Sequence, residues 1–204
     1  MKTYFYTASS LDGFLATSEH SLDWLFAQDF AEDGPMSYTS FIRSIGALVM
    51  GSSTYRWLLD HQTTWEYDLP TWVFSHKEMR VPEGANIHLV QGNISDHFTD
   101  IVTSAEEYAD NTPVETVGTV EQNTTQQGRR NNVWVMGGGD LAGQFADVGL
   151  LDEIWIQFAP VTLGSGQQLL PRKIQLQLLE TAVNNDFVCT RYQVTRDGVE
   201  KWGQ

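Results

Sequence analysis

The feature of this sequence that most restricts its fold is a set of short apolar runs, each of which ends at glycine or hydroxyl residues. Ala47–Met50, Thr71–Phe74 and Val133–Met136 are three such runs. They are too short for buried helices, and their lack of polar alternation is typical of strands that are buried on both faces. The sequence therefore predicts a parallel sheet that is covered on both sides.

Segments with helical spacing alternate with these runs. The other predicted strands are Tyr4–Ser10, Asn86–Val90 and Glu153–Ala159, and the predicted helices are Ser21–Phe26 (one turn), Met36–Ile45, Tyr55–Leu59, Ile94–Tyr108 and Leu141–Val148. Leu176–Thr181 and Val188–Thr195 are expected to form a closing antiparallel pair. We therefore predict one α/β domain over residues 1–204, with a mainly parallel central sheet, helices on both faces and an antiparallel C-terminal edge.

Residues 111–132 depart from this pattern, because they are polar and lack any helical period. We interpret this insertion as a long surface loop or an extra hairpin, and only secondarily as a binding lid.

The charge of the chain excludes several classes of partner. There are 26 acidic and 12 basic residues, which give a formal net charge of −14. Such a surface repels phosphate backbones and anionic membranes, so we expect neither nucleic acid nor membrane as a partner. The five histidines are scattered without ligand spacing, so we expect no metal site.

The compartment is predicted from the start of the chain and from its cysteine content. The first residues lack the apolar segment of a signal peptide. The single cysteine, Cys189, lies in an apolar stretch and reads as a buried structural thiol. Because no cysteines are paired, a reducing compartment is favoured, and we expect a cytoplasmic protein.

Three turns that follow predicted strands carry residues suited to phosphate. The strongest is Gly137-Gly138-Gly139, which opens the helix that contains Leu141. Glycine lets backbone N–H groups approach a ligand, and a helix N-terminus favours an anion. An ordinary tight turn capped by Asp140 is nearly as good an interpretation, since this is not the G-x-G-x-x-G fingerprint.

Two further turns share this design. Gly51, Ser52, Ser53 and Thr54 lie between a strand and a helix, although an ordinary N-cap by Ser52 or Ser53 is the better interpretation of this motif alone. Ser75 and His76 follow another strand, where a solvated loop is the alternative. Ligands of open α/β sheets bind at the carboxyl ends of strands, so the three turns together predict a dinucleotide site.

The order of several motifs along the chain is similar to that of a known family. The motifs are Ser10-Leu11-Asp12-Gly13, Asp23-Trp24-Leu25, Val49-Met50-Gly51, Thr54-Tyr55, Phe74-Ser75, Val135 to Gly139, Gly149 to Glu153 and Ala159 to Gly166. This set resembles the reductase domain of bacterial riboflavin biosynthesis and, more broadly, the dihydrofolate reductase-like superfamily. The resemblance covers nearly the whole chain outside residues 111–132. It implies an eight-stranded, mainly parallel sheet, with NADPH across the strand ends, and a homodimer.

The resemblance also implies roles for particular residues. The cofactor would lie against Gly51, Ser52, Ser53, Thr54, Ser75, His76, Gly137, Gly138, Gly139 and Leu141, with a cis peptide between Gly137 and Gly138. Ala8 and Leu11 would lie near the nicotinamide and the substrate. Asp12 is the candidate catalytic residue, as substrate anchor or proton relay, and an Asx-turn at Asp12-Gly13 is an equally good alternative. Trp24 and Tyr55 could flank a planar substrate, although aromatic residues at such spacing are more often core residues.

The sequence departs from the family at three points. Many relatives have arginine where this chain has Ser52, so a preference for NADPH over NADH is in doubt. The helix at Met36–Ile45 lacks the carboxylate that dihydrofolate reductases use to hold a pterin, which disfavours folate. No deaminase domain precedes the reductase-like region, so the chain resembles stand-alone relatives.

Two functions remain open from the sequence. The first is an NAD(P)H-dependent reductase of a small heterocyclic, pyrimidine-like or pterin-like substrate, similar to 5-amino-6-(5-phosphoribosylamino)uracil reductase. The second is a dinucleotide-binding protein of the same fold without turnover. Asp12 favours the first function, and Ser52 gives some support to the second.

Overall fold

The structure is a computed structural model that describes residues 1–112 and 130–195. Most of the polar insertion expected at 111–132, namely residues 113–129, therefore lies outside the described residues. None of the described helices is long and apolar enough to cross a membrane.

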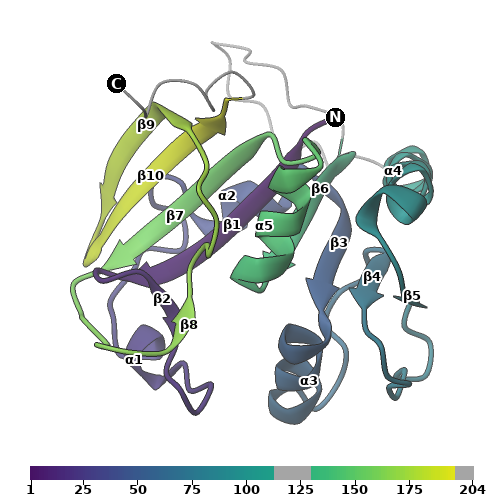
Figure 1. Ribbon diagram of the computed structural model, residues 1–204, viewed down its shortest axis with the longest axis horizontal. Helices are drawn as coiled ribbons and strands as arrows, with labels where there is room; N and C mark the ends of the chain where they lie inside the picture. The colour runs from purple at the N-terminus through teal and green to yellow at the C-terminus, as the bar shows by residue number, and fades with distance from the viewer. Residues whose placement is uncertain (113–129, 196–204) are drawn as a thin grey trace.

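A single eight-stranded sheet forms the centre of the molecule, as expected (Figure 1). Its strand order is β5-β4-β3-β6-β1-β7-β10-β9. The bounds are β1 (Thr3–Ser10), β3 (Ile45–Gly51), β4 (Thr71–Phe74), β5 (Ile87–Val90), β6 (Asn132–Gly137), β7 (Glu153–Ala159), β9 (Leu176–Asn184) and β10 (Phe187–Val194). In this order, all the strands from β5 across the sheet to β7 are parallel to one another, whereas β10 pairs antiparallel with both β7 and β9. The predicted fold class and antiparallel edge are thus confirmed.

Helices cover both faces of this sheet. On one face, α4 (Ile94–Asn111) and α5 (Gly139–Asp147) pack on a core that includes Phe5, Val49 and Val135. On the other face, α2 (Tyr38–Ile42) and α3 (Ser52–His61) pack on Tyr6, Leu48 and Met50 in a second core. Neighbouring residues of β3 therefore serve opposite cores, which is why the run is apolar without alternation.

Local geometry explains why two segments differ from the sequence predictions. The helix expected over Met36–Ile45 is shorter, because Met36 has a positive φ of 55° and Ser37 caps the helix that starts at Tyr38. Ile45 begins β3 instead. A second, two-stranded sheet of β2 (Phe14–Ala16) and β8 (Gln167–Gln168) was not predicted, since strands this short carry no periodic signal.

The segment around α1 (Asp23–Phe26) packs near the C-terminal edge of the sheet. Trp24 and Leu25 contact a small core of Met36, Ala159 and Phe187. Cys189 belongs to this core and is fully buried, and burial raises the pKa of its thiol. It is therefore the structural thiol that the sequence predicted.

Candidate functional site

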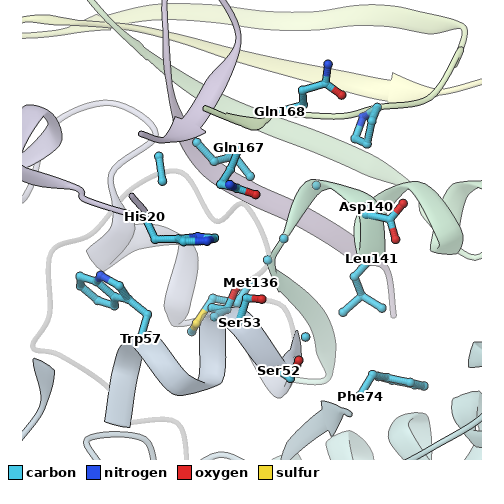
Figure 2. A pocket seen from close by; sticks show the side chains of 18 of the residues that line it. His20, Ser52, Ser53, Trp57, Phe74, Met136, Asp140, Leu141, Gln167 and Gln168 are labelled. Carbon is cyan, nitrogen blue, oxygen red and sulfur yellow. The ribbon is translucent and has the colours of Figure 1, made fainter. Parts of the chain in front are cut away.

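A cleft of about 960 Å³, called here the main cleft, lies at the carboxyl edge of the parallel strands. The turns after β3, β4, β5 and β6 form one wall, and the segments 14–22 and 164–171 form the other. Figure 2 shows Ser52, Phe74 and Leu141 around this space, with His20 and Gln167 contributed by the opposite wall. All ten residues that the sequence nominated for a cofactor line this one cleft.

The turn after β3 presents the N-terminus of α3 to the main cleft. Gly51 is the N-cap residue, and Ser52, Ser53 and Thr54 form the first turn of the helix. No side chain caps this helix. The first backbone N–H groups of a helix have no intrahelical partner, so they are available to an anion in the cleft.

The turn after β6 repeats this arrangement at α5, whose N-cap is Gly138 and which also lacks a capping side chain. A Cβ added at Gly139 would lie 2.2 Å from the carbonyl oxygen of Leu169, so close backbone approach requires glycine there. A Cβ at Gly138 would meet nothing within 4 Å. The peptide bond between Gly137 and Gly138 is cis, as the family resemblance implied. Two uncapped helix N-termini therefore border the same cleft.

Ser75 and His76 border the main cleft where β4 ends. The Ser75 hydroxyl donates to the carbonyl oxygen of Lys77 at 2.8 Å and accepts from the Lys77 N–H at 3.1 Å. This side chain therefore shapes the turn. His76 is exposed and carries no such constraint among the contacts of the described residues.

Fixed charge is scarce in the cleft. No lysine or arginine occurs among the described residues that line it; the ionisable side chains are His20, His76 and Asp140. Hydrogen bonds from Gln144 and Arg172 lower the pKa of Asp140, so its carboxylate is ionised and bound to these neighbours. The cleft must therefore hold an anion mainly through backbone N–H groups and hydroxyls. Within the described ranges, no three His, Cys, Asp or Glu side chains gather as a metal site would need.

Asp12 lies outside the lining of the main cleft and holds one of its walls in place. Its carboxylate accepts the Ser10 hydroxyl at 2.6 Å, the Leu163 N–H at 3.0 Å and the Gly164 N–H at 2.7 Å. The hydrogen bond from Ser10, followed by that from Leu163, lowers the pKa of Asp12 to about 2. Because Gly164 lines the cleft, Asp12 has the geometry of a positioning residue.

The four residues nominated for substrate contact also lie outside this lining. Tyr55 is a correction: its side chain is fully buried, and its hydroxyl donates to the carbonyl oxygen of Arg80, so it serves the core. Ala8 and Trp24 pack on the core near Ala159. Leu11 is 67 % exposed and lies on the turn between β1 and β2.

The sequence did not predict the wall opposite the turns, which contains His20 and the segment Ser165 to Gln168. It also did not predict that Trp57 of α3 and Gln144 of α5 line the main cleft. A signal was present for one of them, since Gly164-Ser165-Gly166 follows a strand in the same way as the nominated turns. His20 and Trp57 gave no such signal, because they enter the cleft through a loop and the side of a helix.

Comparison with known proteins gives a family match over most of the chain. The model of the RibD C-terminal domain matches residues 2–191. The uncharacterized protein YwjB of Bacillus subtilis strain 168 is 28 % identical over 166 residues, which are 81 % of this chain and 80 % of YwjB.

Solved structures share the fold. A protein from Shewanella sp. PV-4, provisionally named a riboflavin biosynthesis protein, is 24 % identical with a TM-score of 0.73, over 96 % of this chain and all of that one. A deaminase/5-amino-6-(5-phosphoribosylamino)uracil reductase from Thermotoga maritima is 12 % identical with a TM-score of 0.63. That match covers 95 % of this chain and 56 % of the Thermotoga protein.

Proposed function

Since the chain belongs to the RibD C-terminal domain family, we propose that it is a reductase that binds NADPH or NADH in the main cleft and reduces a small heterocyclic molecule. The observation that carries the proposal is the convergence of two uncapped helix N-termini, those of α3 and α5, on one cleft at the carboxyl edge of the sheet. A dinucleotide has two linked phosphates, and such termini bind phosphate. The name of the Thermotoga relative supports a heterocyclic substrate.

The residues of the cleft fit such a cofactor. Gly138 leaves open space beside the α5 terminus, and the hydroxyls of Ser52, Ser53 and Thr54 stand at the α3 terminus. When bound, a reduced nicotinamide supplies the hydride. The protein's contribution would be to hold the nicotinamide and the hydride acceptor at the correct distance and orientation and to keep water out of the cleft.

The adenosine 2′-phosphate distinguishes the two cofactors. With Ser52 in place of arginine, and without lysine or arginine in the described lining, that phosphate would contact hydroxyls, backbone and His76. We propose NADPH as the cofactor on the strength of the family, with NADH as the competitor to be measured beside it.

One observation favours the alternative, a dinucleotide-binding protein without turnover. Asp12, the candidate proton relay, accepts hydrogen bonds from Ser10, Leu163 and Gly164, and its lowered pKa makes it a weaker base than an ordinary aspartate. Among the described residues that do line the cleft, His20 and His76 are the side chains placed to act as proton donors. A reductase of this design would take its proton from one of them or from water.

The test is to mix the protein with NADPH or NADH and a panel of pteridines, pyrimidines and flavins as acceptors. Oxidation of the cofactor is monitored as loss of the absorbance of reduced nicotinamide. Acceptor-dependent oxidation supports the reductase. Nucleotide binding without oxidation by any acceptor supports the alternative. Failure of both nucleotides to bind contradicts both.

We also propose that the protein is a homodimer and works in the cytoplasm. The first proposal is supported by exposed valines on the outer strands of the sheet, Val183 and Val188. The second is supported by the buried, unpaired Cys189.

A further inference from the structure

A second cavity of about 480 Å³, called here the side pocket, lies between α1 and α3. Four of its lining residues, His20, Leu22, Ser53 and Trp57, also line the main cleft. Figure 2 shows His20 and Trp57 at the end of the cleft away from Leu141 and Asp140. The two cavities therefore adjoin, and a molecule in the side pocket would lie next to one in the main cleft.

Aromatic rings form one wall of the side pocket. The Trp57 ring stacks with His61 at a centroid distance of 4.2 Å and an interplanar angle of 14°, and with Phe26 at 6.4 Å and 22°. Phe26 is 68 % exposed, although it is large and apolar. Exposed apolar rings beside a cavity mark binding surfaces for apolar or planar groups.

The charged residues of the side pocket disfavour an anion. Glu19, Asp23 and Asp60 line it, against a single arginine, Arg56. Arg56 and Asp60 are four residues apart on α3, so the carboxylate partly offsets the guanidinium. A phosphate placed here would face three carboxylates in a chain whose net charge is already −14.

From this juxtaposition we propose that the side pocket binds the hydride acceptor as a planar heteroaromatic molecule that is uncharged or positively charged and carries no phosphate. This inference rests on the proposed function, because it places the acceptor beside the cofactor cleft. It differs from the phosphoribosyl substrate in the name of the Thermotoga relative.

Riboflavin, flavin mononucleotide and the cation proflavine are suitable probes, because the two flavins differ by one phosphate and all three fluoresce. Titrating the intact protein against each probe measures affinity through quenching. We expect riboflavin and proflavine to bind, and flavin mononucleotide to bind about ten-fold more weakly than riboflavin. The double variant Asp23→Asn, Asp60→Asn should narrow that gap, since it removes two of the three carboxylates.

Two variants separate stacking from general surface binding. Trp57→Leu should lower the affinity for riboflavin about ten-fold. Phe30→Leu changes an exposed ring outside both cavities and should leave that affinity unchanged. The proposal is overturned if flavin mononucleotide binds as tightly as riboflavin, if no probe is quenched, or if Trp57→Leu has no effect. A parallel titration with NADPH distinguishes this failure from failure of the proposed function, which predicts nucleotide binding whether or not the flavins bind.

Discussion

Single residues of the glycine triplet have different physical roles, although the sequence presents them as one motif. Gly139 is required because the carbonyl oxygen of Leu169 lies where a Cβ would be, and Gly137 is close to the hydroxyl of Thr54. Gly138 faces open space at the α5 terminus. The sequence predicts that this turn is special. It does not predict which glycine serves packing and which faces the cleft, because the contacting atoms come from distant segments.

Asp12 shows the same limit of sequence reasoning. Its position after β1 was compatible with catalysis and with a local turn. In the structure one partner, Ser10, is local, but the other two, Leu163 and Gly164, are about 150 residues away in the chain, so a local turn does not describe these contacts.

The pH dependence of Asp12 follows from its lowered pKa of about 2, against an ordinary value of 3.8. A carboxyl group whose pKa is lower in the folded state stabilises that state above its ordinary pKa, and this contribution is lost as the pH falls toward about 2. We therefore expect Asp12→Asn to lower the unfolding midpoint at neutral pH and to weaken nucleotide binding, because segment 163–166 loses its charged anchor.

Thermal unfolding of both proteins at a series of pH values checks this expectation. The difference between wild type and Asp12→Asn should be constant near neutral pH and should shrink as the pH falls below about 4. A difference that grows toward acid pH would contradict the assigned role of Asp12.

Among the secondary-structure elements, the strands of the central sheet were the most predictable. β3, β4 and β6 are buried on both faces, so their runs of apolar residues identify them without any knowledge of their partners. β2 and β8 were not predicted, because they exist only where two distant loops pair. Because these two strands were not predicted, the opposite wall of the main cleft was not predicted either, and His20 and Gln167 were not recognised as lining residues.

The outer strands β9 and β10 give an expectation about assembly. In the described part of the chain, no helix covers these strands on the side of α4 and α5 (Figure 1). Val183 and Val188 are directly paired there, with exposed fractions of 68 % and 50 %. Exposed apolar side chains on an edge strand favour association with a second copy.

We expect Val183→Glu to convert the dimer to a monomer, as measured by size-exclusion chromatography with light scattering. Val148→Glu introduces the same charge at a valine that is 48 % exposed at the end of α5, and should leave the dimer intact. A wild-type protein that is monomeric at micromolar concentration would refute the dimer.

The whole molecule combines a strongly negative chain with a cleft whose turns are suited to phosphate groups. Its described lining offers backbone N–H groups and hydroxyls instead of lysine or arginine. Because phosphates would be held by these local groups, a net charge that disfavours nucleic acid does not also disfavour a dinucleotide. The sequence predicted the turns of the cleft because each follows a recognisable strand, but only the folded sheet shows that they share one edge.

In the proposed function, the N-termini of α3 and α5 together hold one dinucleotide in the main cleft. Calorimetric titration of NADPH into the intact chain and into Gly51→Val measures this binding. A Cβ at Gly51 has no neighbour closer than 3.9 Å, so the first atom of a side chain fits there, and we expect valine to cost about 1 kcal/mol for the altered helix cap.

We expect one nucleotide bound per chain, with an affinity that falls at least about ten-fold in Gly51→Val, while the melting temperature falls by only a few degrees. Shared binding by the two helix termini is contradicted if neither NADPH nor NADH binds, or if Gly51→Val binds NADPH as tightly as the wild type.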